Sequence, residues 1–312
     1  MPNWSEVLNE SQQLTLLKQT EAANAPNIVR HKYLQELHNH TGRNVIAYYS
    51  GFLSKPTVQG IEISDEDKNG FMTAIHRMQR EAGLDLILPT PGGGLSSTQS
   101  LINYLHKMFH PADGIVPNIR AIIPQIAMSA GTIIACSCKE ILMGKQSNIG
   151  PIDPQLNGIP AYGVLKEFER AFKEVKSDPT KIPIWQSIIS QYRPTFLSRC
   201  ENAISGSNTF VMKQLASVMF NGTPNARRKA AKIVRELTHY TKNKGHDRHI
   251  HFEECRQIGL NVTPIEDDAQ LQDLVLTVHH CYMNLLMNTQ SYKIIENHLG
   301  VGIFKNLVTP QR

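Results

Sequence analysis

The sequence predicts an α/β protein in which a parallel or mixed sheet is layered with helices. Three observations support this prediction. Short apolar stretches alternate with amphipathic ones between residues 44 and 144, which is the order of βαβ units. The stretches "LDLILPT" (84–90) and "IRAIIPQI" (119–126) are almost wholly apolar, as in strands covered on both faces. The turns between these stretches are short.

The elements at the start of the chain follow from local composition. Residues 1–43 are polar with helical character, and we expect an arm that docks on a partner subunit. "NVIAYYSGFL" (44–53) carries β-branched and aromatic residues typical of a strand. Ser64 then precedes an acidic turn and apolar Phe71 and Ile75 at helical spacing, which predicts a helix capped by Ser64.

The middle of the chain repeats one pattern. The strand at 84–90 leads through "PGGG" to a helix at 95–109, and the strand at 119–126 leads directly to a helix in "AMSAGTIIACS". "EILMG" (140–144) predicts a further short strand. The strand-to-helix turns in this stretch carry the small residues that tight turns require.

From about residue 160 the sequence predicts long helices. A short helix in "HFEECRQIGL" should end at Gly259, and an amphipathic helix is expected over 267–295. We therefore divide the chain into a helical arm (1–43), an α/β domain (44–265) and a C-terminal helical extension (266–312).

Composition limits the classes of function. Hydrophobic residues make up 41% and charged residues 19%, which is ordinary for a globular protein, and the formal net charge is only +5. No basic run exceeds "ARRKAAK", so nucleic-acid binding is not predicted. The longest apolar stretches are too short to span a bilayer, and the polar N-terminus does not resemble a signal peptide. We expect a cytoplasmic protein.

The cysteines and histidines do not predict a metal or a cofactor. Five cysteines are present, an odd number with no CxxC pair, which favours small buried thiols in a reducing compartment. His246, His249 and His251 lack an acidic or cysteine partner at metal-ligand spacing.

Two loops are the candidate site. "TPGGG" (90–94) and "QIAMSAGT" (125–132) each follow a buried strand, and ligands bind beyond the C-terminal ends of such strands. The glycines match neither GxGxxG nor GxxxxGK[ST], so they favour close substrate approach and backbone N–H donation over nucleotide binding. Ser129 in the second loop has two interpretations from the residues alone, a helix N-cap or a nucleophile.

The two loops together carry a family resemblance. "LDLILPTPGGGLSSTQSLINYL" and "AIIPQIAMSAGTIIACSCKEILMGKQSNIGPIDPQ" resemble the ClpP and signal-peptide-peptidase superfamily, and most closely the serine dehydrogenase proteinases within it. "HDRHIHFEECRQIGL" also looks like that family, and the resemblance covers roughly residues 44–262. It implies a ClpP/crotonase fold of repeated ββα units. The helices expected at the two ends of the chain are added to this fold, and we expect no cofactor.

The resemblance also implies a serine peptidase. Ser129 matches the nucleophile, while Gly93 and Ala130 match the donors of the two oxyanion-hole N–H groups. The implied substrate is a peptide or an unfolded protein. Members of the family generally assemble into oligomers, and we expect a homo-oligomer. Apolar positions in the arm and tail favour this expectation: Leu14, Leu17, Leu274 and Leu276.

The general base is where this sequence departs from the family patterns. The segment that carries the histidine in Clp proteases contains Asp153 here, and the segment that carries their triad aspartate places Asp247 beside His246. A Ser129–His246–Asp153 triad with the two segments exchanged would contain all three residue types.

Two further interpretations of the base stay open. Signal-peptide-peptidase relatives use a lysine, and Lys173, Lys176 and Lys181 fall near that position, with Lys181 preferred. The chain could also lack a working base and serve as a binding scaffold. A crotonase-type acyl-CoA enzyme is disfavoured, because such enzymes rely on carboxylates and not on a serine in "MSAGT".

Overall fold

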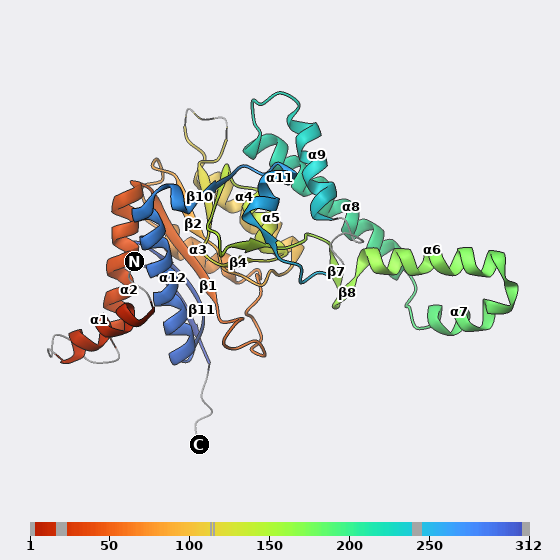
Figure 1. Cartoon of the computed structure of the whole chain (residues 1–312), viewed down its shortest axis with the longest axis horizontal. Helices are drawn as coiled ribbons and strands as arrows, with labels where there is room; N and C mark the ends of the chain where they lie inside the picture. Colours follow the sequence, from red (N-terminus) through yellow and green to blue (C-terminus); the bar gives the residue numbers. More distant parts are fainter. Residues whose placement is uncertain (1–3, 17–23, 113, 115, 239–244, 308–312) are drawn as a thin grey trace, which may run out of the picture.

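The fold is an α/β architecture around a central mixed sheet, as the sequence predicts (Figure 1). The computed structural model describes residues 4–16, 24–112, 114, 116–238 and 245–307. The sheet has seven strands in the order β10-β5-β3-β2-β1-β11-β12. Five of them run parallel, in sheet order β10 (Val262–Pro264), β5 (Glu140–Met143), β3 (Ile119–Ile123), β2 (Leu84–Ile87) and β1 (Asn44–Ser50).

The remaining two strands come from the C-terminal part of the chain. β11 (Ser291–Asn297) pairs antiparallel with β1, and β12 (Gly302–Asn306) pairs antiparallel with β11. The prediction of a helix through residue 295 is wrong for this end, because α12 (Ala269–Asn288) stops at Asn288. The β-branched and aromatic run "SYKII" instead extends along β1, whose backbone offers a ladder of hydrogen bonds.

A second, small sheet gives the fold its repeated ββα character. It contains β4 (Ile126–Ala127), β6 (Asn148–Ile149) and β9 (Ile250–His251), with β4 parallel and β9 antiparallel to β6. β3 continues into β4 and then α5 (Ala130–Cys136), and β5 continues into β6. After β2, Thr90 makes an isolated bridge to Ala127 of β4. The loops that follow β2, β3 and β5 therefore all lie at the same edge of the central sheet, beside the small sheet.

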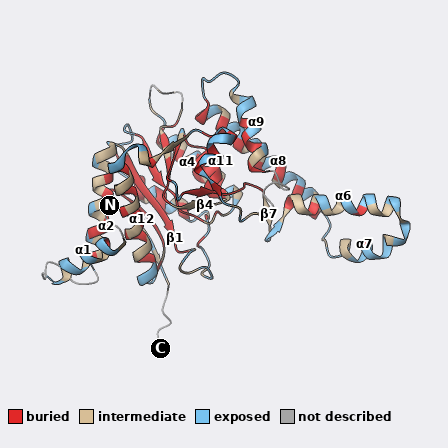
Figure 2. Cartoon of the chain, viewed as in Figure 1, coloured by how far each residue is buried: buried red, intermediate tan, exposed pale blue. Residues whose placement is uncertain are grey.

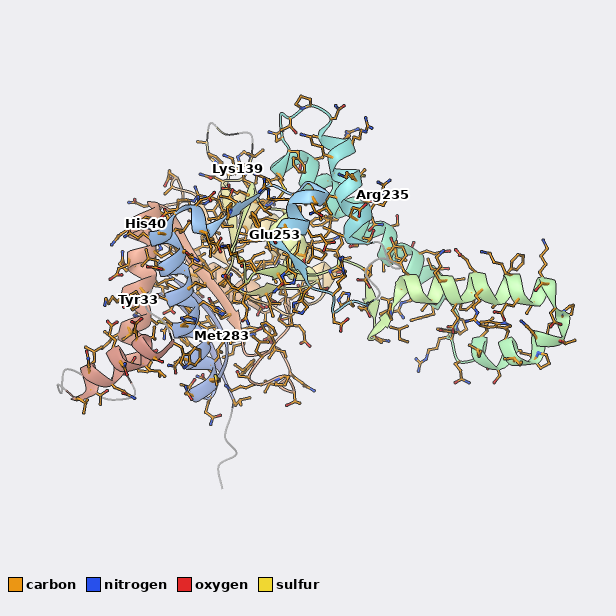
Figure 3. The ribbon with its side chains drawn as sticks, in the orientation of Figure 1. Tyr33, His40, Lys139, Arg235, Glu253 and Met283 are labelled. Carbon is orange, nitrogen blue, oxygen red and sulfur yellow. The ribbon has the colours of Figure 1, made fainter. Side chains whose placement is uncertain are left out.

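Side-chain alternation along the strands builds two cores. Val45, Ala47 and Tyr49 of β1 are buried with α2 (Ala25–Thr41) and α12, whereas Ile46 and Tyr48 are buried in the larger core on the other face. The larger core holds α3 (Asp67–Ile75), α4 (Leu95–Met108), α5, α9 (Ala226–Leu237), α11 (Phe252–Ile258) and the C-terminal half of α8 (Phe196–Gln214). The helices α2 and α12, which cover one face of the sheet, can be found in Figure 3 by the labels of Tyr33 and Met283.

The N-terminal helices and the end of α11 agree with the sequence prediction, whereas the start of α3 does not. α1 (Trp4–Leu16) and α2 confirm the helical arm within the described residues. Ser64 is not the N-cap of the next helix, because α3 begins at Asp67 and Glu66 occupies the N-cap position. Gly259 ends α11 with a left-handed φ of 104°, as predicted. The division into three segments stays a prediction.

A helical hairpin projects from the body of the molecule. β7 (Gln155–Leu156) and β8 (Ile159–Pro160) lead into α6 (Ala161–Ser177), which is followed by the 3-10 turn Pro179–Lys181 and α7 (Ile182–Ile189). Figure 2 shows that much of this hairpin is exposed. Phe172 and Ile184, both apolar, are 71% and 63% exposed.

The leucines chosen from the sequence differ in burial, and Leu276 is half-buried on α12. Leu274 is buried in the chain's own core, and Leu14 packs against the cluster of Val7, Val29 and Cys281. Leu17 lies outside the described residues. The expected homo-oligomer stays a prediction.

All five cysteines are free and buried, which confirms the prediction of small core thiols. Burial raises the pKa of the Cys136 and Cys138 thiols to about 12.

Among the helices that the structure describes, none combines the length and apolar character needed to cross a bilayer.

A buried ion pair joins α2 to β11. Arg30 Nε and Nη2 donate to the two carboxylate oxygens of Glu296, at 2.8 and 3.1 Å, and Tyr282 OH also donates to this carboxylate. Burial opposes ionisation of Glu296, but the hydrogen bonds from His31 and Arg30 outweigh it and lower the pKa to about 2 from an ordinary 4.5. The Glu296 carboxylate therefore stays ionised in the folded protein at pH values between about 2 and 4.5, where it would be largely protonated in the unfolded chain.

Acid should weaken the fold through this carboxylate. Because the folded-state pKa of Glu296 is depressed, its stabilisation is present above about pH 4.5 and is lost as the pH falls towards about 2. We expect urea unfolding to show a shallower decline of the unfolding free energy over this window in Arg30→Met/Glu296→Gln than in the parent. Equal slopes would contradict the assignment.

Candidate active site

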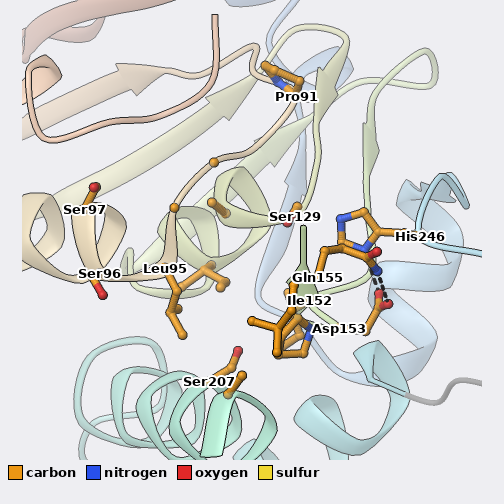
Figure 4. A pocket seen from close by; sticks show the side chains of 17 residues that line it. Pro91, Leu95, Ser96, Ser97, Ser129, Ile152, Asp153, Gln155, Ser207 and His246 are labelled. Carbon is orange, nitrogen blue, oxygen red and sulfur yellow. Dashed lines mark hydrogen bonds and ion pairs between the residues drawn. The ribbon is translucent and has the colours of Figure 1, made fainter. Parts of the chain in front are cut away.

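The sequence-predicted loops meet at one cavity of about 420 Å³ (Figure 4). Gly93 and Ser129 line it, as the strand ends predict. Ala130, Asp153 and His246 line the same cavity, although His246 lies 117 positions after Ser129 in the sequence. Its walls are otherwise formed by short polar and apolar side chains from α4, α5, α8 and the β6–β7 loop.

Ser129 has a strained backbone. It lies between β4 and α5 with φ 51° and ψ −112°, a combination that residues with a Cβ rarely adopt. It occupies the N-cap position of α5, yet its side chain makes no capping hydrogen bond. Such a sharp turn between a strand and a helix exposes a serine hydroxyl, and strain of this kind clusters at functional sites. The cap interpretation of Ser129 therefore loses its main support.

The glycine loop fits closely between Ser129 and a neighbouring segment. A Cβ on Gly92 would lie 2.7 Å from Ser129 Cβ, and one on Gly93 would lie 2.3 Å from the Ile63 carbonyl oxygen. Ile63 N–H donates to Gly92 O at 2.7 Å, and Gly94 N–H donates to Ile63 O at 3.1 Å. Only glycine satisfies both the space and the positive φ at positions 92 and 93.

Two backbone N–H groups are available at the cavity. Ala130 is the first residue of α5, so its N–H has no carbonyl one turn earlier in the helix to bond. Gly93 sits opposite Ile63 in an isolated parallel bridge whose hydrogen bonds are made by Gly92 and Gly94, which leaves the Gly93 N–H directed away from Ile63. Donors of this kind stabilise an oxyanion that forms on a bound carbonyl group.

Thr132 holds the serine turn in place, a role that sequence reasoning missed. Its buried hydroxyl donates towards Ala127 O at 3.0 Å and Gly150 O at 2.9 Å, and it accepts from Gly150 N–H at 3.0 Å. It thus ties the start of α5 to the end of β4 and to the segment after β6. The threonine of "MSAGT" was the available signal, because a buried hydroxyl needs several partners.

His246 and Asp153 form a hydrogen-bonded pair in the cavity that Ser129 lines. His246 Nδ1 lies 2.8 Å from Asp153 Oδ1, and Gln155 Nε2 donates to Asp153 Oδ2 at 2.9 Å. The Asp153 side chain is 7% exposed and that of His246 is 29% exposed. Because a carboxylate accepts, Nδ1 carries the proton, and Nε2 is the imidazole nitrogen left for a reacting group. Figure 4 shows the ring among the side chains that line the cavity with Ser129.

The pairing of β9 with β6 brings His246 and Asp153 together. Ile149 pairs with Ile250, so the residues before β9 lie opposite those after β6. The exchange of the two segments considered from the sequence is therefore geometrically possible. Asp247, which the resemblance aligned with a triad aspartate, is exposed and is not part of the cavity wall.

The lysine candidates lie elsewhere. Lys181 sits in the 3-10 turn of the projecting hairpin, where its Nζ lies 3.4 Å from Glu174 Oε2. Lys173 and Lys176 are on α6 of the same hairpin. None of the three lines the cavity that holds Ser129. Within the described part of the chain, no group of three or more His, Cys, Asp or Glu side chains could hold a metal ion.

Comparison with known proteins gives a consistent result. The sequence profile of a family described as ClpP-like SDH-type serine proteinase matches residues 14–295. The uncharacterized protein MJ0137 of Methanocaldococcus jannaschii is 28% identical over 260 residues, which cover 82% of this chain and 79% of that protein. The uncharacterized protein MJ1495 of the same organism is 33% identical over 158 residues, or 49% of this chain and 51% of that protein.

Gly92→Ala should remove the reactivity of Ser129 without unfolding the protein. The added methyl group would collide with Ser129 Cβ, so we expect fluorophosphonate labelling of Ser129 to fall at least about a hundredfold. Gly158→Ala is the matched control, because Gly158 also has a positive φ, of 78°, but nothing lies within 4 Å of the added Cβ. Intact-mass measurement follows both; equal labelling of the two variants would contradict the prediction.

Proposed function

The chain belongs to the ClpP-like SDH-type serine proteinases, and from this premise we propose that it hydrolyses peptide bonds with Ser129 as the nucleophile. The observation that carries the proposal is the 2.8 Å contact between His246 and Asp153 in the cavity that Ser129 lines. The strained backbone of Ser129 and the unused N–H groups of Gly93 and Ala130 support it further.

The proposed reaction uses each of these groups once in acylation. Ser129 Oγ attacks the scissile carbonyl carbon while His246 Nε2 takes the hydroxyl proton. Asp153 holds the imidazole by its Nδ1–H and stabilises the imidazolium that forms. The N–H groups of Gly93 and Ala130 bind the oxyanion, and His246 then gives its proton to the leaving amine. Water, activated by the same imidazole, releases the acyl group.

The alternatives receive less support. A lysine base would have to come from the projecting hairpin, where Lys181 pairs with Glu174. A catalytically silent scaffold would gain nothing from a serine held in strained backbone beside a His–Asp pair. Activity measurements decide between peptidase and scaffold.

We infer that the substrate is a peptide or an unfolded protein with an apolar side chain near the scissile bond. Leu95, Ile133, Ile152 and Leu156 supply apolar walls to the cavity. Burying an apolar side chain of the substrate there is favourable, and a folded domain could not enter a cavity of about 420 Å³. The five buried free thiols favour a reducing, cytoplasmic location.

Mutation of His246 tests the mechanism. We expect His246→Ala to lower peptide turnover by about 10³-fold or more, because the members of a triad act as a unit. Lys181→Ala should leave turnover within about twofold of the parent, since loss of an exposed ion pair has little effect. Peptide hydrolysis and intact-mass analysis after fluorophosphonate treatment give the measurement.

The outcomes separate the hypotheses. A parent protein that forms no Ser129 adduct and cleaves no peptide would support the scaffold. Loss of activity in Lys181→Ala with activity kept in His246→Ala would replace the histidine base with a lysine. Asp153→Asn should share the defect of His246→Ala, because an amide fails to hold the same tautomer.

We also propose a homo-oligomer that contacts through the projecting hairpin. We expect each contact to bury at least about 1,000 Å². Phe172→Glu/Ile184→Glu should lower the oligomeric mass measured by light scattering, because it places charges in an apolar contact. Glu169→Gln, on exposed polar surface of α6, is the control. A monomeric parent at micromolar concentration would rule out the proposal.

A further inference from the structure

The glycine loop at the cavity depends on one neighbouring segment, Glu62–Ser64. Ile63 exchanges two backbone hydrogen bonds with Gly92 and Gly94, and these bonds direct the N–H of Gly93, which lines the cavity, away from Ile63. The segment itself belongs to no strand beyond this isolated bridge. It therefore needs another anchor if Gly93 is to keep its orientation.

A buried ion pair supplies that anchor. Lys293 Nζ of β11 donates to Glu62 O at 2.7 Å and to the two Asp67 carboxylate oxygens at 2.9 and 3.0 Å. Asp67 Oδ2 in turn accepts from Ser64 N–H at 3.0 Å and from Tyr48 OH at 2.9 Å. The ion pair thus holds the segment on both sides of Ile63.

The energetics indicate positioning and not stability. The Lys293 and Asp67 side chains are 1% and 0% exposed, and burial lowers the pKa of Lys293 from its ordinary value. A buried ion pair roughly offsets its own desolvation, so an apolar pair of similar size would serve stability as well. What an apolar pair could not supply is the donor to Glu62 O and the acceptor for Ser64 N–H.

We propose that Lys293 and Asp67 are positioning residues, which hold the Glu62–Ser64 segment and through it the N–H of Gly93 at the cavity that Ser129 lines. The proposal rests on the proposed peptidase function, and it gives strand β11 a part in the active site. Neither residue lines the cavity, and both act through the backbone on either side of Ile63.

The chain contains a matched control. Lys293 and Glu296 lie three positions apart on β11, and each belongs to a buried ion pair on one of the two faces of the sheet. Glu296 pairs with Arg30 of α2, and the hydrogen bonds of this pair do not involve the Glu62–Ser64 segment or the glycine loop. Asp67→Asn/Lys293→Met and Arg30→Met/Glu296→Gln therefore make the same chemical change, an amide and a thioether for an ion pair, with only the first reaching Glu62.

Hydrogen–deuterium exchange tests the anchor without requiring activity. Asp67→Asn/Lys293→Met should increase the exchange rate of the Ile63 and Gly94 amides at least about tenfold, because the bond to Glu62 O is lost. Arg30→Met/Glu296→Gln should leave these two amides at the parent rate. Unchanged exchange in the first variant would overturn the proposal.

Labelling by a fluorophosphonate tests the consequence for the site. The first variant should lower the maximal labelling rate of Ser129 by about tenfold to a hundredfold with the half-saturating probe concentration changed less than about threefold, because the phosphoryl oxygen uses the same N–H donors. The control pair should keep the parent rate. Faster exchange with unchanged labelling would overturn the positioning role. A parent that is not labelled refutes the proposed function instead, and the exchange experiment alone then judges the anchor.

Discussion

The candidate site depends on the backbone of Ser129, which is held where a residue with a Cβ is strained. Such a conformation costs on the order of 1–3 kcal/mol and persists only where the surroundings fix it. Gly131 N–H closes the turn on Met128 O at 2.7 Å, Thr132 binds it to Ala127 and Gly150, and Gly92 leaves the space that Ser129 needs. The small residues of "PGGG" and "MSAGT" are therefore one structural unit divided between two loops.

Local patterns in the sequence predict the parts of the fold that are locally determined. Continuous apolar runs identify β2 and β3, and the loops that follow them identify Gly93 and Ser129, because parallel strands deliver their ends to one edge. The N-cap expected at Ser64 is wrong, because α3 begins at Asp67 with Glu66 in the N-cap position. Asp67 itself is held by Lys293 of β11, and local sequence cannot reveal so distant a partner.

Other features required contacts between distant segments. Asp153 and His246 are 93 positions apart, and the sequence offers them only as one of several choices for the base; the pairing of β9 with β6 is what brings them together. Sequence spacing leaves Lys181 as an alternative base, but a position along the chain does not show that this residue lies on a hairpin outside the cavity. The end of α12 was misjudged because "SYKII" is apolar enough for a helix, and the free edge of β1 makes it a strand.

β11 connects these observations. Its alternation sends Lys293 and Ile295 to the face of α3, and Ile294 and Glu296 to the face of α2 and α12. A one-residue shift in the pairing of β11 with β1 would exchange the two charges between faces and leave both Asp67 and Arg30 without their partners. The same two ion pairs that are costly to bury therefore specify the register of this strand, and the register in turn sets the position of Glu62 and the glycine loop. A strand far from the cavity in sequence is in this way part of the support of the site.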